Sequence, residues 1–346
     1  MLFAMSRVSC LTILLLMAVL LLPADLMAAR PREGVASPFP LLSDEECWRI
    51  LPATEKGGGQ ALPSWARAMA SAMPRTTAAM LQLDFSHRAR NPLGPLLRGK
   101  MRWVAGQANR CEYSMAYAES DLRRAGLEEA GLRSLRGDHG DLPEPERAAL
   151  AFARQMTLDA SEVTDAEVAH LIARYGERKV TAMVLLLAHA NFQDRLLLAL
   201  GSPIEPGGPM PPLEIDFDPK ADPPSVPRRE RPEGRPVPEE PARIDDPFWL
   251  SMEFDDLQGK LTEQRERPSR IRVPSWEELL RMMPPEFPRP ERPIRIRWSL
   301  VTMGYQPELA MAWSATTKAF REEAKQDRIF EESLFWIVTR TIHCFY

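Results

Sequence analysis

The sequence predicts an all-α protein in which one helical unit occurs twice. Apolar residues recur at spacings of three to four through most of the first 200 residues, and the alternation expected of β-strands is almost absent. Residue types also match without a gap at positions 233 apart, in six pairs: Trp65 and Trp298, Pro74 and Pro307, Ala79 and Ala312, Trp103 and Trp336, Cys111 and Cys344, Tyr113 and Tyr346. So many matches in one register indicate a duplicated domain.

The N-terminal 29 residues predict a secretory signal peptide. Arg7 precedes an apolar run from Leu11 to Leu22, and small residues follow at the expected cleavage site. The alternative is an uncleaved membrane anchor, but a spanning helix needs about 20 apolar residues, and Pro23 and Asp25 interrupt this run. We therefore expect a secreted or periplasmic protein, attached to a membrane only if the segment is not cleaved.

The first domain is expected over residues 48 to 201, with six helices. Gly126 and Gly176 are placed as C-terminal stops, and Thr164 with Glu167 forms a capping-box pattern. Polar residues in the last helix argue against a membrane span. The predicted helices are Thr76 to His87, Leu96 to Arg110, Glu112 to Ala125, Glu146 to Leu158, Thr164 to Tyr175 and Glu177 to Leu200.

A proline-rich segment over residues 202 to 247 divides the two copies. It holds 14 of the 33 prolines and few large apolar residues, so it predicts an extended, semi-rigid connector. Residues 248 to 346 then read as the N-terminal part of a second domain.

Composition excludes several kinds of function. The net charge of −4, without a block of lysine or arginine, argues against nucleic-acid binding. No histidine or carboxylate spacing resembles a metal site, and no glycine loop opens a helix as phosphate-binding loops do. We therefore expect neither a metal nor a cofactor.

The residues that could carry chemistry lie between Trp103 and Ala118, around Asn-Arg-Cys-Glu-Tyr-Ser at residues 109 to 114. This segment resembles the carboxymuconolactone decarboxylase family, in particular its alkylhydroperoxidase-like branch, whose signature is Asn-x-Cys-x-Tyr-Cys followed by histidine. The resemblance continues through residues 142 to 153 and 180 to 201, where Asn191 and Arg195 stand at familiar places. It covers roughly residues 60 to 201 and again 290 to 346.

The resemblance implies a compact helical bundle that self-associates and reduces peroxides with two cysteines. One thiolate attacks the peroxide, the second thiol resolves the sulfenic acid to a disulfide, and a glutamate and a histidine relay the proton. Electrons would come from a separate dithiol reductant protein.

The first copy departs from this pattern. Cys111 fills the first cysteine position, but Ser114 fills the second, Tyr117 and Ala118 stand where the family has histidine, and Gly99 stands in place of its glutamate. Because serine cannot resolve a sulfenic acid, we expect Cys111 to be a buried packing residue. A reactive thiol stays the alternative, since Asn109 could cap the next helix and lower the pKa of the thiol.

The second copy matches better and then ends. Glu332 stands at the family's glutamate position and Cys344 at the first cysteine, whereas the second cysteine would be residue 347. We expect a truncated reading frame or a fragment, in which the candidate catalytic residues are Cys344, Glu332 and Cys111. The complete form would be a thiol peroxidase, and the chain that ends at Tyr346 would be inactive or impaired.

A different class of function is a binding or assembly module that keeps the fold without its chemistry. The helical region from Ile329 to Tyr346 would expose several large apolar residues, which favours pairing with another subunit. Other unusual residues are expected to be structural: Cys47 as a small buried side chain, His189 facing water or making one local hydrogen bond, and Trp65, Trp103, Trp298 and Trp336 as core anchors.

Overall fold

The computed structural model describes residues 39–218, 253–342 and 344 of the chain. Over these residues the fold is mostly helical, with 13 α-helices, 66% helix and negligible strand, so the predicted all-α class is confirmed. The predicted signal peptide, most of the proline-rich connector and His343 lie outside the described residues.

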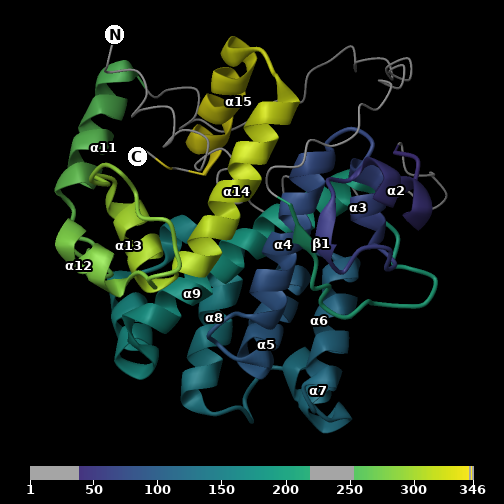
Figure 1. The fold of residues 1–346 in the computed structure, drawn as a ribbon. Coiled ribbons are helices and arrows are strands. Elements are labelled where there is room, and N and C mark those ends of the chain that lie inside the picture. Colours follow the sequence, from purple (N-terminus) through teal and green to yellow (C-terminus); the bar gives the residue numbers. More distant parts are fainter. Residues whose placement is uncertain (1–38, 219–252, 343, 345–346) are drawn as a thin grey trace.

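The first bundle consists of the eight helices between residues 44 and 200 (Figure 1). Five of them, α4, α5, α6, α8 and both halves of α9, match the predicted ranges to within a few residues. The eight are α2 (Asp44–Ile50), α3 (Ser64–Met69), α4 (Pro74–Ala89), α5 (Pro95–Ala108), α6 (Glu112–Arg124), α7 (Glu129–Arg136), α8 (Glu144–Leu158) and α9 (Asp165–Leu200).

The predicted helix boundaries have the expected local causes. Thr164 Oγ1 accepts from the backbone N–H of Glu167 at 3.2 Å, and the Glu167 carboxylate accepts from the backbone of Thr164 at 2.7 Å, which completes the capping box of α9. Gly126 follows α6 with a φ of 87°. Gly176 interrupts α9 with a φ of 76°, a conformation that strains other residues. Element α9 thus consists of two helices that meet at a kink at Gly176, where the sequence predicted a stop.

Two apolar clusters stabilise the first bundle. The larger one joins α5, α6, α7, α8 and α9 around Met101, Trp103 and Met183, each at most 2% exposed. The second lies where α2, α3 and α4 meet the start of α6 and the end of α9, around Trp65. Trp65 and Trp103 are thus core anchors, as predicted. Trp298 is only partly buried and Trp336 is 46% exposed, so the core-anchor prediction is wrong for Trp336.

The start of the proline-rich segment belongs to the first bundle instead of an extended connector. Leu213, Ile215 and Phe217 are buried in the second apolar cluster. Strand β2 (Asp216–Phe217) pairs antiparallel with β1 (Thr54–Lys56). The few apolar residues of this segment therefore bury enough surface to order residues 203 to 217, which composition alone did not indicate.

One helix in the described part of the chain, α9, is long and apolar enough to cross a membrane. Within its most apolar stretch, 72% of the residues are buried inside the protein. This burial makes α9 the central core helix of the first bundle.

The second segment comprises residues 254 to 341. Its last three helices begin 233 positions after α3, α4 and α5, and α15 also ends 233 positions after α5. The helix starts therefore follow the same spacing as the sequence matches. The elements are α11 (Phe254–Glu266), α12 (Trp276–Met282), α13 (Arg297–Tyr305), α14 (Pro307–Ala324) and α15 (Arg328–Thr341).

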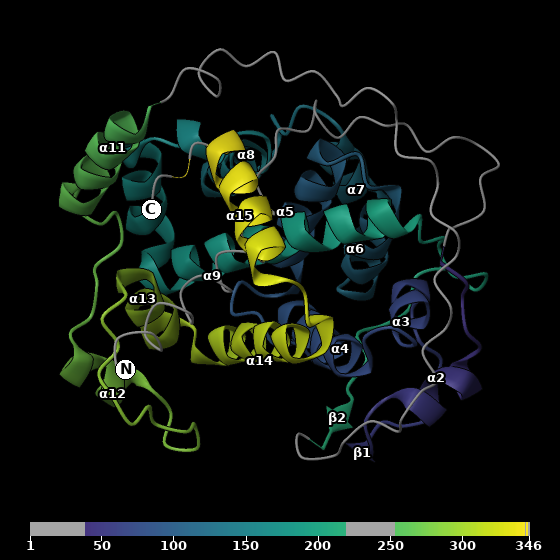
Figure 2. The same cartoon turned by 90° about the horizontal axis from the view of Figure 1, so that it is seen from above.

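Helix α14 packs along α4 (Figure 2). The two run antiparallel, because the start of α4 meets the end of α14 at Glu323 and the end of α4 meets the start of α14 at Glu308. Its Leu309 and Trp313 are at most 5% exposed and form a small core with Leu83 and Leu185 of the first bundle. Helix α15 instead rises above the bundle beyond the end of α14 (Figures 1 and 2).

Each end of the α4–α14 pair carries a polar contact with a glutamate carboxylate. At one end the Glu323 carboxylate accepts from the backbone N–H of Arg75 at 2.6 Å and of Thr76 at 2.7 Å. At the other end Arg90 lies 3.1 Å from Glu308. Positions 75 and 308, like 90 and 323, are 233 apart, so the same two positions meet twice with the charges exchanged.

Glu323 supplies the N-terminal cap that α4 lacks, since Met73 at the cap position offers no side-chain acceptor. We expect Glu323→Ala to lower the free energy of unfolding by about 1 to 2 kcal/mol, because two backbone donors and the helix dipole lose their anion. Urea denaturation measures this loss. The control is Glu322→Ala, which removes two exposed pairs, with Arg75 at 3.4 Å and with Lys318 at 3.9 Å, and should cost less than about 1 kcal/mol. Equal losses in the two variants would contradict the capping role.

Candidate functional site

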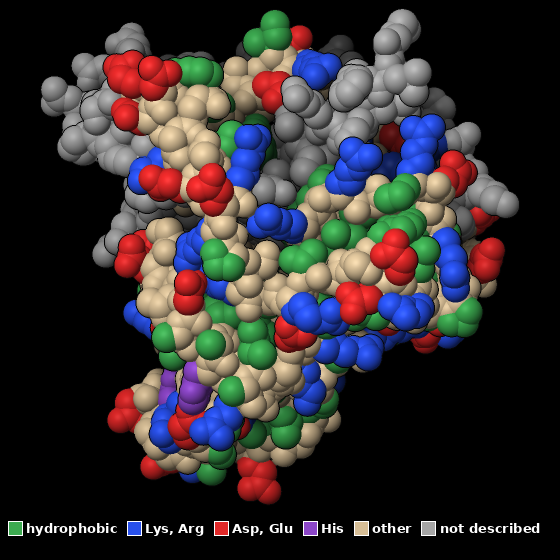
Figure 3. All heavy atoms as spheres, turned by 90° about the vertical axis from the view of Figure 1, so that its left-hand side faces the viewer, with side chains coloured by type: hydrophobic (Ala, Val, Ile, Leu, Met, Phe, Trp, Pro, Cys, Tyr) green, Lys and Arg blue, Asp and Glu red, His purple; other side chains and the backbone are tan. Residues whose placement is uncertain are grey.

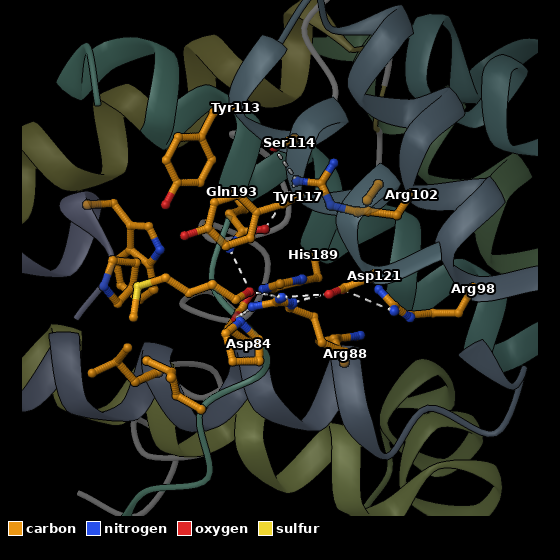
Figure 4. Close-up of a pocket in the computed structure, with 18 of the residues that line it drawn as sticks. Asp84, Arg88, Arg98, Arg102, Tyr113, Ser114, Tyr117, Asp121, His189 and Gln193 are labelled. Atoms are coloured by element: carbon orange, nitrogen blue, oxygen red, sulfur yellow. Dashed lines mark hydrogen bonds and ion pairs between the residues drawn. The ribbon is translucent and has the colours of Figure 1, made fainter. Parts of the chain in front are cut away.

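The candidate site is a polar pocket inside the first bundle, between α4, α5, α6 and α9 (Figure 4). Residues 210 to 213 close one side of it. The free cavity of about 30 Å³ is large enough for about two water molecules or a molecule of similar size. A larger ligand would require the surrounding helices to move.

Helices α5, α6 and α9 meet at the Asp194 carboxylate beside this pocket. Asp194 is fully buried and pairs with Arg102 of α5, with Nη1 of Arg102 3.1 Å from Oδ2. Ser114 Oγ of α6 donates to Asp194 at 2.5 Å, and Asn109 Nδ2 donates at 2.8 Å. Cys111 Sγ in turn lies 3.3 Å from Ser114 Oγ.

Cys111 is a buried residue, 1% exposed, as the packing interpretation predicted. Burial raises the pKa of its thiol to about 12, with the negative charge of Asp194 acting in the same direction. The prediction that Asn109 caps α6 is wrong, because Cys111 occupies the cap position and the Asn109 amide donates to Asn191 and Asp194. Burial and the nearby carboxylate therefore favour the protonated thiol over the thiolate, which is the nucleophilic form.

The two tyrosines of the motif bind a carboxylate from the proline-rich segment. Tyr113 and Tyr117 stack at 4.5 Å, and their hydroxyls donate to Glu205 at 2.8 and 2.6 Å. The backbone N–H of Ser64 donates to the same carboxylate at 2.7 Å. Burial raises the pKa of both tyrosines. Tyr117, at one of the family's histidine positions, is therefore a structural donor.

A second buried charge network lines the other side of the pocket (Figure 4). Asp121 accepts from Arg88 at 2.8 Å and from Arg98 at 3.1 Å. Arg88 also reaches Asp84 at 3.2 Å. Burial alone would raise the pKa of Asp121, but hydrogen bonds and charge from Arg88 and Arg98 outweigh it and lower the pKa. These charges neutralise one another, so the pocket offers a ligand no uncompensated charge.

Two buried histidines stack at the α4–α9 contact, next to the second segment. The rings of His87 and His189 lie 4.3 Å apart and nearly parallel, and the edge of Trp313 from α14 approaches His189 at 6.2 Å. The expectation that His189 faces water is wrong, because its side of α9 packs against α4. Burial lowers the pKa of His189 to about 3 and that of His87 well below its ordinary value. Both ring nitrogens of His87 lack a protein hydrogen-bond partner within the described residues.

The structure separates the three candidate catalytic residues predicted from the sequence. Cys111 lies inside the first bundle, where its thiol is hydrogen-bonded to Ser114. Glu332 lies on α15 and pairs with Arg328 of the same helix at 3.8 Å. Cys344 follows α15 and is partly exposed. Gly99, at the first copy's glutamate position, faces Leu122 so closely that an added Cβ would lie 2.7 Å from that side chain.

Sequence reasoning missed most residues that build the pocket. Asp84 with Arg88, and Arg98 with Arg102, are pairs spaced by four, which places each pair on one helix face. Charged pairs on helix faces that also carry buried apolar residues are the signal that could have identified them. Glu205 and Asp194 gave no such signal, because their partners are distant in sequence.

Among residues 39–218, 253–342 and 344, no group of three or more histidine, cysteine, aspartate or glutamate residues could hold a metal ion. A scan of family models, a search of curated proteins and a search of solved structures gave no match. The site itself consists of a small polar cavity, charged side chains that pair with one another, and a buried thiol.

The buried histidine pair makes stability depend on pH. Their pKa values are lower in the folded protein than in the unfolded chain, so stability is complete above about pH 6.5 and is lost as the pH falls toward about 3. With both rings neutral in the native state, the free energy of unfolding should fall by up to about 2.7 kcal/mol per pH unit below about pH 5.5.

Urea denaturation at several pH values measures this slope. His87→Phe keeps a stacked ring but removes one titrating group, and the slope should fall by about half. His189→Phe should act in the same way. A slope that neither substitution changes would contradict the assignment to this pair.

Proposed function

We propose that this chain is a binding or assembly module built from two copies of one helical unit. The observation that carries the proposal is the antiparallel pairing of α4 with α14, helices that begin 233 positions apart. The unit thus associates with its own repeat inside one chain. The family that the sequence resembles forms self-associating bundles, and the proposal extends that property to this chain.

The contacts of the α4–α14 pair support a stable association. Leu309 and Trp313 are buried against Leu83, Leu185 and Phe192. Full burial of a leucine side chain contributes about 1.5 to 3 kcal/mol. The polar contacts at the two ends favour the antiparallel register, because a shift by one turn would separate Glu323 from the start of α4 and Arg90 from Glu308. Beyond these helices, Tyr305 donates to Glu177 at 2.7 Å and attaches α13 to α9.

The outer surface is consistent with an association module of mixed charge. On the face drawn in Figure 3, acidic and basic side chains lie interspersed. Several form ion pairs between the two segments, such as Arg270 with Asp165 at 2.5 Å. Such exposed pairs contribute little stability each but favour one orientation of the segments.

An apolar-to-charged substitution in α14 tests the proposal. Leu309→Asp places a charge in the α4–α14 core and should release the second segment, so limited proteolysis should cut within residues 254 to 324 at least ten times faster. The core of α5, α6, α8 and α9 should stay resistant in the same sample. Lys318→Asp, at a largely exposed position of α14, is the matched control. Equal cleavage rates for Leu309→Asp, Lys318→Asp and the unaltered chain would refute the association.

Thiol-dependent peroxide reduction is the second candidate, implied by the family resemblance and favoured by the partial exposure of Cys344. The Cys344 thiolate would take one oxygen from a peroxide, giving a sulfenic acid and releasing an alcohol or water. A thiol of a dithiol partner would then form a mixed disulfide and release water, and its second thiol would restore Cys344. Glu332 would relay the proton only if it approached Cys344.

Peroxide consumption with a dithiol reductant separates the two candidates. The assembly proposal predicts no turnover above that of the unaltered chain after denaturation. Site-resolved alkylation of the native protein should modify Cys344 and leave Cys47 and Cys111 unmodified, because both are buried and burial raises the pKa of each thiol. Turnover that disappears in Cys344→Ser and survives in Cys111→Ser would establish the peroxidase instead.

A further inference from the structure

A cleft lies between α9 of the first bundle and the second segment, and we call it the interface cleft. Its volume of about 420 Å³ falls within the range of small-molecule sites, which favour boundaries between packed units. Helix α9 forms one side, and α13, the end of α11 and residues 267 to 273 form the rest (Figure 2). Most of its wall is apolar and comprises Val184, Leu185, Ile271, Val273, Trp298 and Val301.

Contacts with the first bundle hold the wall of the interface cleft in place. Arg270 donates to the backbone carbonyl of Val163 at 2.6 Å, and the backbone N–H of Arg272 donates to Glu177 at 2.9 Å. Ile271, between these two arginines, packs against the larger apolar cluster. The cleft is therefore formed before a ligand binds, which lowers the entropic cost of binding.

The charged side chains that line the interface cleft, among the described residues, are three arginines. Arg267 and Arg270 share one carboxylate, that of Asp165, at 2.6 and 2.5 Å. Arg297 donates from Nη1 to the backbone carbonyl of Arg267 at 3.4 Å, and no carboxylate in the described part of the chain pairs with it. Three cations thus share one anion, so the cleft has an excess of positive charge.

Two threonines on the wall have already used their hydroxyl protons. Thr181 Oγ1 donates to the backbone carbonyl of Glu177 at 2.8 Å, and Thr302 Oγ1 donates to that of Trp298 at 3.1 Å. Each bond stays within the helix that carries the threonine. A polar group of a ligand is therefore matched best by the arginines, and its apolar part by the rest of the wall.

The start of α13 also favours an anion at Arg297. Its cap residue, Ile296, offers no side-chain acceptor, and the first turn carries no acidic residue, although the free N–H groups and the helix dipole attract negative charge. The first repeat shows what can bind there. Ser64, the first residue of α3 and 233 positions before Arg297, donates from its backbone N–H to the Glu205 carboxylate at 2.7 Å.

We propose that the interface cleft binds a small apolar molecule with one carboxylate, such as a medium-chain fatty acid. The carboxylate pairs with Arg297 at the start of α13, and the hydrocarbon part lies against the apolar wall beside Trp298. This inference goes beyond the assembly function, because it gives the boundary between the two segments a ligand. It requires the second segment to be in place, since that segment supplies the arginines.

Isothermal titration calorimetry of the full-length chain with four probes tests the proposal. Decanoate, used below the concentration at which it forms micelles, should bind at one molecule per chain. Decanol lacks the charge and acetate lacks the hydrocarbon part, so each should bind at least tenfold more weakly. Decyltrimethylammonium carries the opposite charge and should not bind detectably.

Substitutions at the cleft locate the binding site. Arg297→Gln should weaken decanoate binding at least tenfold and leave decanol binding unchanged, whereas Arg297→Lys should retain most of the affinity. Arg295→Gln is the matched control, because Arg295 is exposed and does not line the cleft. Val301→Trp fills the cleft and should abolish binding of both molecules. Resistance of that variant to proteolysis within residues 254 to 324 shows that the second segment is still folded.

A ligand that contacts both segments should also stabilise their association. At ten times its Kd, decanoate should slow the proteolytic release of the second segment about elevenfold in the unaltered chain and not in Val301→Trp.

Several outcomes would overturn the inference. Absence of saturable decanoate binding, or equal affinities for decanoate and decanol, would show that the cleft does not select an apolar carboxylate. Equal losses in Arg297→Gln and Arg295→Gln would show that only the overall charge matters, and binding that survives Val301→Trp would place the ligand elsewhere. The association of α14 with α4 is tested without ligand by Leu309→Asp. It can hold while decanoate fails to bind, so the two failures are distinguishable.

Discussion

The first bundle depends on the buried carboxylate of Asp194. This group pairs with Arg102 and accepts hydrogen bonds from Ser114 and Asn109, and so joins α5, α6 and α9 at one point. A buried ion pair is costly to break, because the remaining charge is left without a partner, at about 3 to 5 kcal/mol. Burial, and after it the same negative charge, raises the pKa of Cys111. The interaction that closes the bundle therefore also keeps its thiol protonated.

Helices α5 and α15, which lie 233 positions apart, are packed in different ways. In α5 the positions of Arg98 and Arg102 carry buried cations, each matched by an aspartate from a neighbouring helix. In α15 these positions carry Glu331 and Phe335, and the described chain provides no counterpart of those aspartates. What the second segment keeps is the outer pair, α13 and α14, which packs on α4 and α9. The second segment thus packs on the first bundle through α13 and α14, while α15 differs from α5 in charge.

Patterns of neighbouring residues predicted the helices whose position and limits depend on neighbouring residues. Apolar periodicity located α4, α5, α6, α8 and α9, the capping box of Thr164 located the start of α9, and Gly176 located the kink inside it. The six-residue α3 and the eight-residue α7 are too short to show a clear period, and they are held by tertiary packing. Glu205 was assigned to the connector because its surroundings are rich in proline. Its partners, Tyr113 and Tyr117, lie about 90 residues earlier, so no local pattern indicated the contact. The burial of Cys111 was predictable because Ser114 stands at the second cysteine position of the motif, and a serine cannot resolve a sulfenic acid.

Helices α5 and α15 lie 233 positions apart and differ in burial: Met101, Trp103 and Val104 of α5 are at most 2% exposed, whereas Leu334, Trp336 and Ile337 of α15 are 39 to 46% exposed. Hydrogen exchange of the backbone amides, read by mass spectrometry, compares the two helices within one molecule. Amides of a closed core exchange only through large-scale unfolding, whereas a helix with few tertiary contacts opens locally. Amides of residues 329 to 339 should therefore exchange at least a hundred times faster than those of residues 96 to 106. Equal protection of the two helices would contradict this expectation.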